Sequence, residues 1–138
     1  MARKIFVNLP VKDLKRSVDF FAQLGFKFDA RFTDENATCM IVDENICVML
    51  LLEPFFRNFT QKEIADASRY TEVIVSLTTE NRAEVDETVR KAVAAGASTP
   101  TEAKDFGFMY QHGFQDPDGH LWEVFYMDPN AANQQPQK

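Results

Sequence analysis

One glutamate near the carboxyl end of the chain, Glu123, has the residue type and the setting of a functional acid. It follows Asp116-Pro117-Asp118-Gly119, where proline presets φ and glycine permits positive φ, so a tight turn is expected there. A strand over residues 120–126 would alternate its side chains between two faces. Leu121, Glu123 and Phe125 then share one face, which places a carboxylate on a partly apolar surface. Such an acid is expected to gain a polar partner and is typical of a functional site.

The two histidines have weaker claims to chemistry. The same alternation puts His120 on the face opposite Glu123, and His112 shares a face with Tyr110 and Phe114, where packing is the expected role. The sequence contains no Ser-His-Asp order, glycine-rich phosphate loop, zinc-type cysteine pattern or dinucleotide fingerprint. A nucleotide-dependent activity is therefore disfavoured.

The composition limits the class of partner. The 138 residues, 45% of them hydrophobic, suffice for one domain with a core, predicted over residues 1–128. With 15 basic and 21 acidic residues the net charge is −6, which argues against nucleic acid and anionic membranes and favours small molecules or proteins. No stretch has the length of a signal sequence or a membrane span, so we expect a cytoplasmic protein.

Two copies of one order of elements, βαβββ, follow each other along the chain. The first module, residues 3–53, has strands expected at 4–11, 26–32, 37–42 and 46–52, with a helix from Asp13 to Gly25 after the first strand. The second, residues 71–128, has strands expected at 72–78, 97–104, 106–115 and 120–126. Its helix is expected between Asn81 and Gly96. Residues 129–138 lack apolar periodicity and are predicted to be disordered.

Two cysteines flank a hairpin predicted at Asp43-Glu44-Asn45. If the turn pairs Val42 with Cys47, then Cys39 lies opposite Leu50, and the two sulfur atoms would not face each other. We therefore expect free thiols, in agreement with a reducing compartment.

The connector between the modules, residues 54–70, is unusually rich in phenylalanine. Its aromatic side chains need burial, and three arrangements are open: covering one end of the sheet, forming a lid over a ligand, or lying in a subunit interface. Thr60-Gln61-Lys62-Glu63 has the pattern of a capping box, which predicts a short helix there.

Two segments of the chain resemble the vicinal oxygen chelate superfamily, the group of glyoxalase I, extradiol dioxygenases and bleomycin-resistance proteins. They are Val7-Asn8-Leu9-Pro10-Val11-Lys12-Asp13-Leu14, with Leu24-Gly25-Phe26 after it, and Phe114-Gln115-Asp116-Pro117-Asp118-Gly119-His120-Leu121-Trp122-Glu123. With the doubled βαβββ order, the resemblance covers nearly the whole chain. It implies an α+β fold in which two βαβββ modules form a cup-shaped mixed sheet with the helices on its convex side.

The resemblance also implies a homodimer and a divalent metal, held by residues on the first and last strands of the modules. By the landmarks of the two segments, the four ligand positions are Phe6, Met49, Glu72 and Glu123, with Leu50 in place of Met49 if the hairpin register shifts by one residue. Phenylalanine cannot ligate, and a thioether is a poor ligand for hard or borderline metals. The expected site is therefore incomplete or non-standard: Ni, Zn, Mn or Mg bound by Glu72 and Glu123, or no metal.

Two functions remain open. In one, the protein is a glyoxalase-like lyase or isomerase, less readily an extradiol dioxygenase, that acts on a small carbonyl or vicinal-oxygen compound. Glu72 and Glu123 would then bind the metal or, without one, act as catalytic base and acid. In the other, the protein sequesters a small molecule, as bleomycin-resistance proteins do. Either function would use an apolar ligand pocket, and the alternative is packing against a partner subunit. The residues expected to line the pocket are Phe6, Asn8, Met49, Ile74, Gln111 and Phe125.

Overall fold

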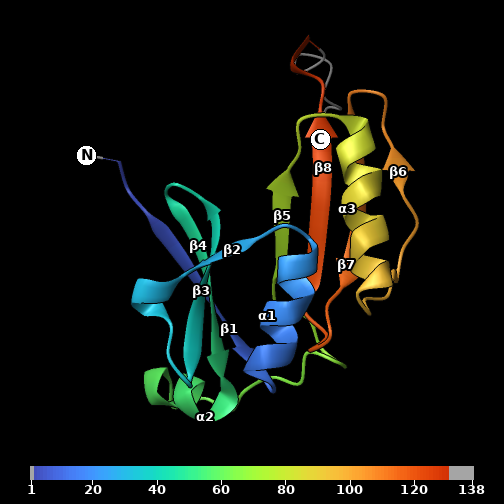
Figure 1. Cartoon of the computed structure of the whole chain (residues 1–138). Coiled ribbons are helices and arrows are strands. Elements are labelled where there is room, and N and C mark those ends of the chain that lie inside the picture. The colour runs from blue at the N-terminus through green and yellow to red at the C-terminus, as the bar shows by residue number, and fades with distance from the viewer. Residues whose placement is uncertain (1, 131–138) are drawn as a thin grey trace. The chain divides into compact units, whose positions relative to one another are not determined.

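The computed structural model describes residues 2–130, and the chain divides into two compact units, Met1–Asp66 and Ala67–Lys138 (Figure 1). Each unit contains one four-stranded mixed sheet and its own buried core. None of the helices within residues 2–130 combines the length and the apolar character needed to cross a membrane.

The first unit has the order βαβββ. Its main elements are β1 (Ile5–Val11), α1 (Leu14–Gln23), β2 (Lys27–Asp29), β3 (Ala37–Asp43) and β4 (Ile46–Leu52). The strands lie in the order β1-β4-β3-β2, with β1 parallel to β4 and the other neighbours antiparallel. Helix α1 contacts β4, and its buried Phe20 and Phe21 form the core with Val48 and Leu50 of that strand.

The second unit repeats this plan. It consists of β5 (Ile74–Thr78), α3 (Arg82–Ala94), β6 (Lys104–Asp105), β7 (Met109–Gln115) and β8 (Leu121–Met127). The strand order is β5-β8-β7-β6, again with the first and last strands parallel. Helix α3 contacts β7 and β8, the strands that carry the buried Phe114, Trp122 and Val124. The α+β class and the doubled βαβββ order are thus confirmed.

The expected helix ends are present in both units. The Asp13 side chain caps α1 by accepting a hydrogen bond of 3.0 Å from the backbone N–H of Arg16. The Asn81 side chain caps α3 by accepting one of 2.8 Å from the backbone N–H of Glu84. After α1 the chain turns at Gly25, whose φ of +101° lies in the left-handed region that favours glycine.

Several strands are shorter than the sequence predicts. The strand expected over 26–32 stops at Asp29, whose carboxylate accepts from the N–H of Arg31 and caps the 3₁₀ turn Ala30–Phe32. The strand expected over 97–104 is mostly irregular: it has one isolated bridge, between Ser98 and Gln115, before the two-residue β6.

The connector contains helical residues, but not where they were predicted. Helix α2 (Glu53–Phe56) and the 3₁₀ turn Arg57–Phe59 directly follow β4. The predicted helix at residues 60–63 is absent: the Thr60 hydroxyl accepts from the N–H of Lys62 at 3.0 Å, a local turn that replaces helical bonding. Helix α2 contacts β1 and β4, so this part of the connector covers its own sheet. Of the tail predicted to be disordered, residues 131–138 lie outside the described part of the chain.

A buried carboxylate organises the turn before β8. Asp116, only 5% exposed, accepts hydrogen bonds from the N–H groups of Asp118 and His120 and from the indole Nε1 of Trp122, at 2.9, 3.0 and 3.0 Å. Burial raises the pKa of Asp116, and the charge of His120 and the bond from Trp122 oppose that shift. Gly119, with a φ of +97°, completes the turn. The start of β8, two residues before Glu123, is therefore held at a defined place.

Candidate functional site

Glu123 lies near the middle of β8, between Ser76 of β5 and Gly113 of β7. The Ser76 hydroxyl donates a hydrogen bond of 2.9 Å to Glu123 Oε1. The polar partner expected for this carboxylate is therefore present, although it comes from a strand 47 residues away in the sequence. One oxygen is held by the hydroxyl, and the half-buried carboxylate stays on an accessible face of the sheet.

Gly113 lies directly opposite Glu123, where β7 and β8 approach closely. A Cβ at this position would lie 3.5 Å from Glu123 Cγ and only 2.7 Å from the backbone oxygen of Trp122. Any side chain here would therefore press on the backbone of β8, whereas its contact with the glutamate would be an ordinary one. The glycine permits the close approach of the two strands at Glu123.

The rest of this face is mainly apolar. Leu121 and Phe125 lie two residues before and after Glu123 on β8. Leu121 pairs with Ile74 of β5, and Phe125 pairs with Gln111 of β7. The side chain of Ile74 is exposed, and those of Leu121, Phe125 and Gln111 are half-buried. We call this surface the Glu123 face; it consists of Ile74, Ser76, Gln111, Gly113, Leu121, Glu123 and Phe125. It brings together four of the eight predicted site residues.

Glu72 is not part of the pair that Glu123 forms. It lies in an exposed bend before β5, and the β5 residue opposite Glu123 is Ser76, four positions further along. Glu72 therefore lies outside the β5–β8 ladder that pairs Ser76 with Glu123. Within residues 2–130, no three His, Cys, Asp or Glu side chains are grouped to hold a metal.

The histidines lie as the alternation predicts. His112 is in register with Val124 on the face that carries the core, and its Nε2 is 3.1 Å from the backbone oxygen of Thr101. His120 precedes β8 and donates its backbone N–H to the turn carboxylate of Asp116. Neither histidine is on the Glu123 face.

The other three predicted site residues lie in the first unit. Phe6 is in register with Cys47, and Asn8 with Met49, so all four side chains share one face of the first sheet. Phe6 is 45% exposed and its ring meets that of Phe32 edge-on at 6.4 Å. These three predicted site residues thus lie on one face of the first sheet, and Ile74, Gln111 and Phe125 lie in the second unit.

The hairpin register differs by one residue from the prediction. Cys39 lies opposite Met49 and Ile41 opposite Cys47, because the register shifts at Val42, between Ile41 and Asp43. A shift of one residue moves a side chain to the other face, so Cys39 and Cys47 share a face, contrary to the expectation. Both are free thiols, and Cys39 is fully buried. Burial and a hydrogen bond with Cys47 raise the pKa of Cys39 to about 12.

An ion pair lies beside the cysteines. Asp29 of β2 is in register with Cys39, and Arg31 binds both of its carboxylate oxygens, with Nη2–Oδ2 at 2.7 Å and Nε–Oδ1 at 3.1 Å. The hydrogen bonds from Arg31 hold the pKa of Asp29 below its usual value. The guanidinium also interacts electrostatically with both thiols.

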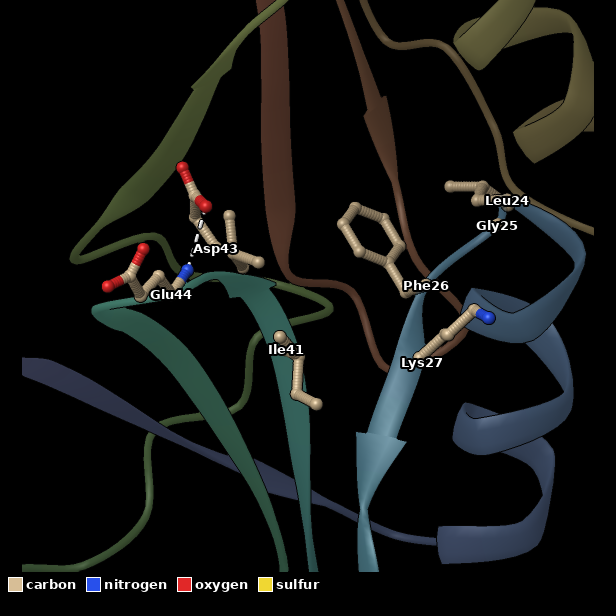
Figure 2. Close-up of a pocket in the computed structure, with 8 residues that line it drawn as sticks. Leu24, Gly25, Phe26, Lys27, Ile41, Asp43 and Glu44 are labelled. Atoms are coloured by element: carbon tan, nitrogen blue, oxygen red, sulfur yellow. Dashed lines mark hydrogen bonds between the residues drawn. The ribbon is translucent and has the colours of Figure 1, made fainter.

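A separate open hollow of about 510 Å³ lies at the end of the first sheet (Figure 2). Its wall comes from the end of α1, the start of β2 and the hairpin between β3 and β4, where Asp43 accepts from the N–H of Glu44 at 2.7 Å. Phe26 and Ile41 supply apolar surface, and Lys27 supplies a positive charge. None of the predicted site residues lines this hollow.

The sequence analysis did not identify three of the residues described above: Ser76 and Gly113 on the Glu123 face, and Asp29 beside the cysteines. Ser76 follows Ile74 by two positions, so strand alternation alone could have placed it on the face of Ile74. Gly113 is an isolated glycine in a strand, a pattern that indicates a close approach or an open site. No pattern in the sequence indicated that Asp29 lies beside Cys39, because this position depends on the pairing of β2 with β3.

The sequence matches one protein family, described as "Glyoxalase/Bleomycin resistance protein/Dioxygenase superfamily", over residues 5–124. Among curated proteins, none is similar at a significant level.

Solved structures share the fold. A hypothetical protein, SA1046 from S. aureus, is 28% identical, with a TM-score of 0.78 over 91% of this chain and 94% of that one. A glyoxalase/bleomycin resistance protein/dioxygenase family enzyme from Burkholderia phytofirmans PsJN is 17% identical, with a TM-score of 0.78 over 91% and 99% of the two chains. TioX from Micromonospora sp. ML1 is 21% identical, with a TM-score of 0.66 over 91% and 99%.

Proposed function

Because this chain belongs to the glyoxalase/bleomycin resistance protein/dioxygenase superfamily, we propose that it binds a small molecule on the Glu123 face, with Glu123 as the polar anchor. The observation that carries the proposal is the Ser76–Glu123 hydrogen bond on an otherwise apolar surface. A carboxylate oriented by a neighbour and surrounded by apolar side chains selects a ligand that has both an apolar body and a hydrogen-bond donor or positive charge.

The donor set supports binding without a resident divalent metal. Of the four positions that match the metal ligands of the family, Phe6 has no donor atom and Met49 offers only a soft thioether. Glu123 shares one oxygen with Ser76, and Glu72 lies four residues from that pair. These residues do not fit the hard-donor site of a glyoxalase, so no step through such a metal is assigned.

The ligand class is tested by thermal unfolding and calorimetry with bleomycin and with aromatic amines as probes. A ligand that binds the native state at one hundred times its Kd stabilises it by about 2.7 kcal/mol, which is a measurable shift in melting temperature. We expect Glu123→Gln to remove the shift. Glu102→Gln, which changes an exposed carboxylate in the same unit, should leave it intact.

The variant Glu72→Gln distinguishes this proposal from the hypothesis that Glu72 and Glu123 act together. If Glu123 alone anchors the ligand, the Glu72 variant binds like the wild type. Equal losses in the Glu72 and Glu123 variants would show that the two acids act together and would contradict the proposal. Retained binding in Glu123→Gln would place the ligand elsewhere.

A glyoxalase-like enzyme is the second candidate, because Glu123 occupies a ligand position of the family. Its test is isomerisation of the adduct of methylglyoxal and glutathione, with Ni²⁺, Zn²⁺, Mn²⁺ or Mg²⁺ added singly. Turnover that needs both an added metal and Glu123 would favour this enzyme over a sequestering protein.

We propose a homodimer in the cytoplasm, in which Phe6, Asn8 and Met49 of the first sheet line a ligand pocket. Exposed apolar residues at the outer strand β1, such as Ile5 and Phe6, support an interface or a pocket there. Light scattering after size-exclusion chromatography measures the mass, and a monomer would contradict the dimer.

A further inference from the structure

Three sulfur-containing side chains of the first unit gather on one face of its sheet. Met49 lies directly opposite Cys39 across the β3–β4 pair, and Cys47 is two residues before Met49 on the same strand. Opposite residues in a sheet have Cβ atoms about 4.5–5.5 Å apart, and diagonal neighbours are within reach of longer side chains. Cys47 is such a diagonal neighbour of Cys39, because the residue directly opposite Cys47 is Ile41, two positions after Cys39. We call Cys39, Cys47 and Met49 the sulfur cluster.

The chemistry of these donors selects a soft metal ion. Thiolate and thioether sulfur bind Cu(I) in preference to Mg²⁺, Ca²⁺ or Mn²⁺, which prefer oxygen. We infer that the sulfur cluster binds one Cu(I) ion through the two cysteine thiolates and the methionine thioether. This site lies in the first unit and shares Met49 with the pocket proposed on the first sheet; it does not depend on the function proposed for the Glu123 face.

The neighbouring ion pair disfavours zinc. A structural Zn²⁺ site needs four nitrogen, sulfur or oxygen ligands in a tetrahedron. Asp29 is the nearest carboxylate in register with Cys39, but Arg31 already binds both of its oxygens. Three soft donors without a hard fourth one suit a monovalent soft ion better than zinc.

The charges balance when Cu(I) binds. Both thiols lose a proton, two Cu–S(thiolate) bonds form, and the metal remains Cu(I), so no oxidant or reductant takes part. The product, two thiolates and one monovalent cation, carries a net charge of −1. Arg31, which interacts electrostatically with both cysteines, supplies a positive charge beside it.

The ion can enter from the side of Cys47. Cys39 is fully buried, whereas Cys47 and Met49 are half-buried on the same face. Cys47 therefore meets the ion first, and Cys39 completes the site from within.

The test is titration of the full chain with Cu(I) under anaerobic conditions with ascorbate, against bicinchoninate as a coloured competitor. We expect one ion per chain and the release of two protons. Cys39→Ala and Cys47→Ala should each lower the affinity for Cu(I) by more than about 100-fold, because loss of a direct ligand costs more than loss of a residue that only supports a ligand. Met49→Leu should lower it by about 10-fold. Met109→Leu, a half-buried methionine of the second unit, is the matched control and should not change the affinity. Unchanged affinity in Cys47→Ala, or equal effects of Met49→Leu and Met109→Leu, would overturn the inference.

A second measurement covers variants that fail to fold. In the wild type, one equivalent of Cu(I) should slow the alkylation of Cys47 by iodoacetamide at least tenfold, as read by peptide mass spectrometry. Alkylation at an unchanged rate would overturn the inference. So would formation of a Cys39–Cys47 disulfide, seen as a loss of two mass units, in place of the metal complex.

Discussion

Replacing Asp116 by alanine should destabilise the second unit strongly, although this residue is not on the Glu123 face. Its carboxylate is 5% exposed and accepts three hydrogen bonds, at 2.9, 3.0 and 3.0 Å. Two of them come from the backbone of the turn, and the third comes from Trp122, the largest buried side chain. Alanine removes both carboxylate oxygens and with them all three hydrogen bonds.

The expected loss follows from the burial of each donor. The indole N–H of Trp122 is in the core and finds no water when the carboxylate is gone, which costs about 1–3 kcal/mol. The N–H groups of Asp118 and His120 lie in a half-buried turn and can be partly rehydrated, so about 1 kcal/mol each is expected. Relief from burying the carboxylate offsets part of this sum. The net loss should be about 3 kcal/mol, a large share of the 5–15 kcal/mol typical of a domain.

Urea unfolding measures this loss, with far-UV circular dichroism as the signal. Trp122 is the only tryptophan, so its fluorescence reports the same transition at the site itself. Asp116→Asn keeps one acceptor oxygen for the two backbone donors and loses the bond to the indole, so a smaller loss of about 1–2 kcal/mol is expected.

A double-mutant cycle with Trp122→Phe isolates the bond between the two side chains. We expect the second substitution to cost less in the Asp116→Ala background, because the indole then has no acceptor to lose. A loss below about 1 kcal/mol for Asp116→Ala, or no coupling in the cycle, would refute the reasoning that this carboxylate holds the turn.

Three further outcomes are expected. First, the pKa of Asp116 is raised by burial, so its contribution to the free energy of unfolding is greatest below 3.8 and is lost as pH rises through the folded-state pKa. Urea midpoints between about pH 3 and pH 7 should show this loss, and Asp116→Asn should remove it. Second, Gly113→Ala should cost about 1–3 kcal/mol in thermal unfolding, because its Cβ would lie 2.7 Å from the Trp122 backbone oxygen. A stability equal to that of the wild type would contradict the close approach of β7 and β8. Third, iodoacetamide should label Cys47 before Cys39, since Cys39 is fully buried with a pKa of about 12. Peptide mass spectrometry checks the order, and equal rates would contradict it.

Local hydrogen bonding explains why the helices could be predicted. The caps at Asp13 and Asn81 use residues only three positions apart, and Gly25 takes a backbone conformation that few other residues adopt. Such features depend on a few neighbouring residues, so the sequence contains them in full. The same holds for the alternation that puts Leu121, Glu123 and Phe125 on one face.

The hairpin shows where this reasoning ends. The turn at Asp43-Glu44-Asn45 allows more than one pairing, and the shift at Val42 selects the one that puts Cys39 opposite Met49. Because side chains alternate with a period of two, a slip of one residue reverses the face of every residue on the strand. Cys39 and Cys47 therefore share a face only because the register shifts by one residue at Val42.

The sequence by itself determined the doubled βαβββ order, the helix caps, the turn before β8 and the face on which Glu123 lies. The tertiary structure decided which residues lie beside it: Ser76 as the hydrogen-bond donor and Gly113 at the close approach of β7 to β8, with Glu72 in the bend before β5. The physical reason is that alternation within a strand is local, whereas the pairing of β5 with β8 joins residues 47 positions apart. That register is set by the packing of the whole unit, which no short pattern of residues encodes.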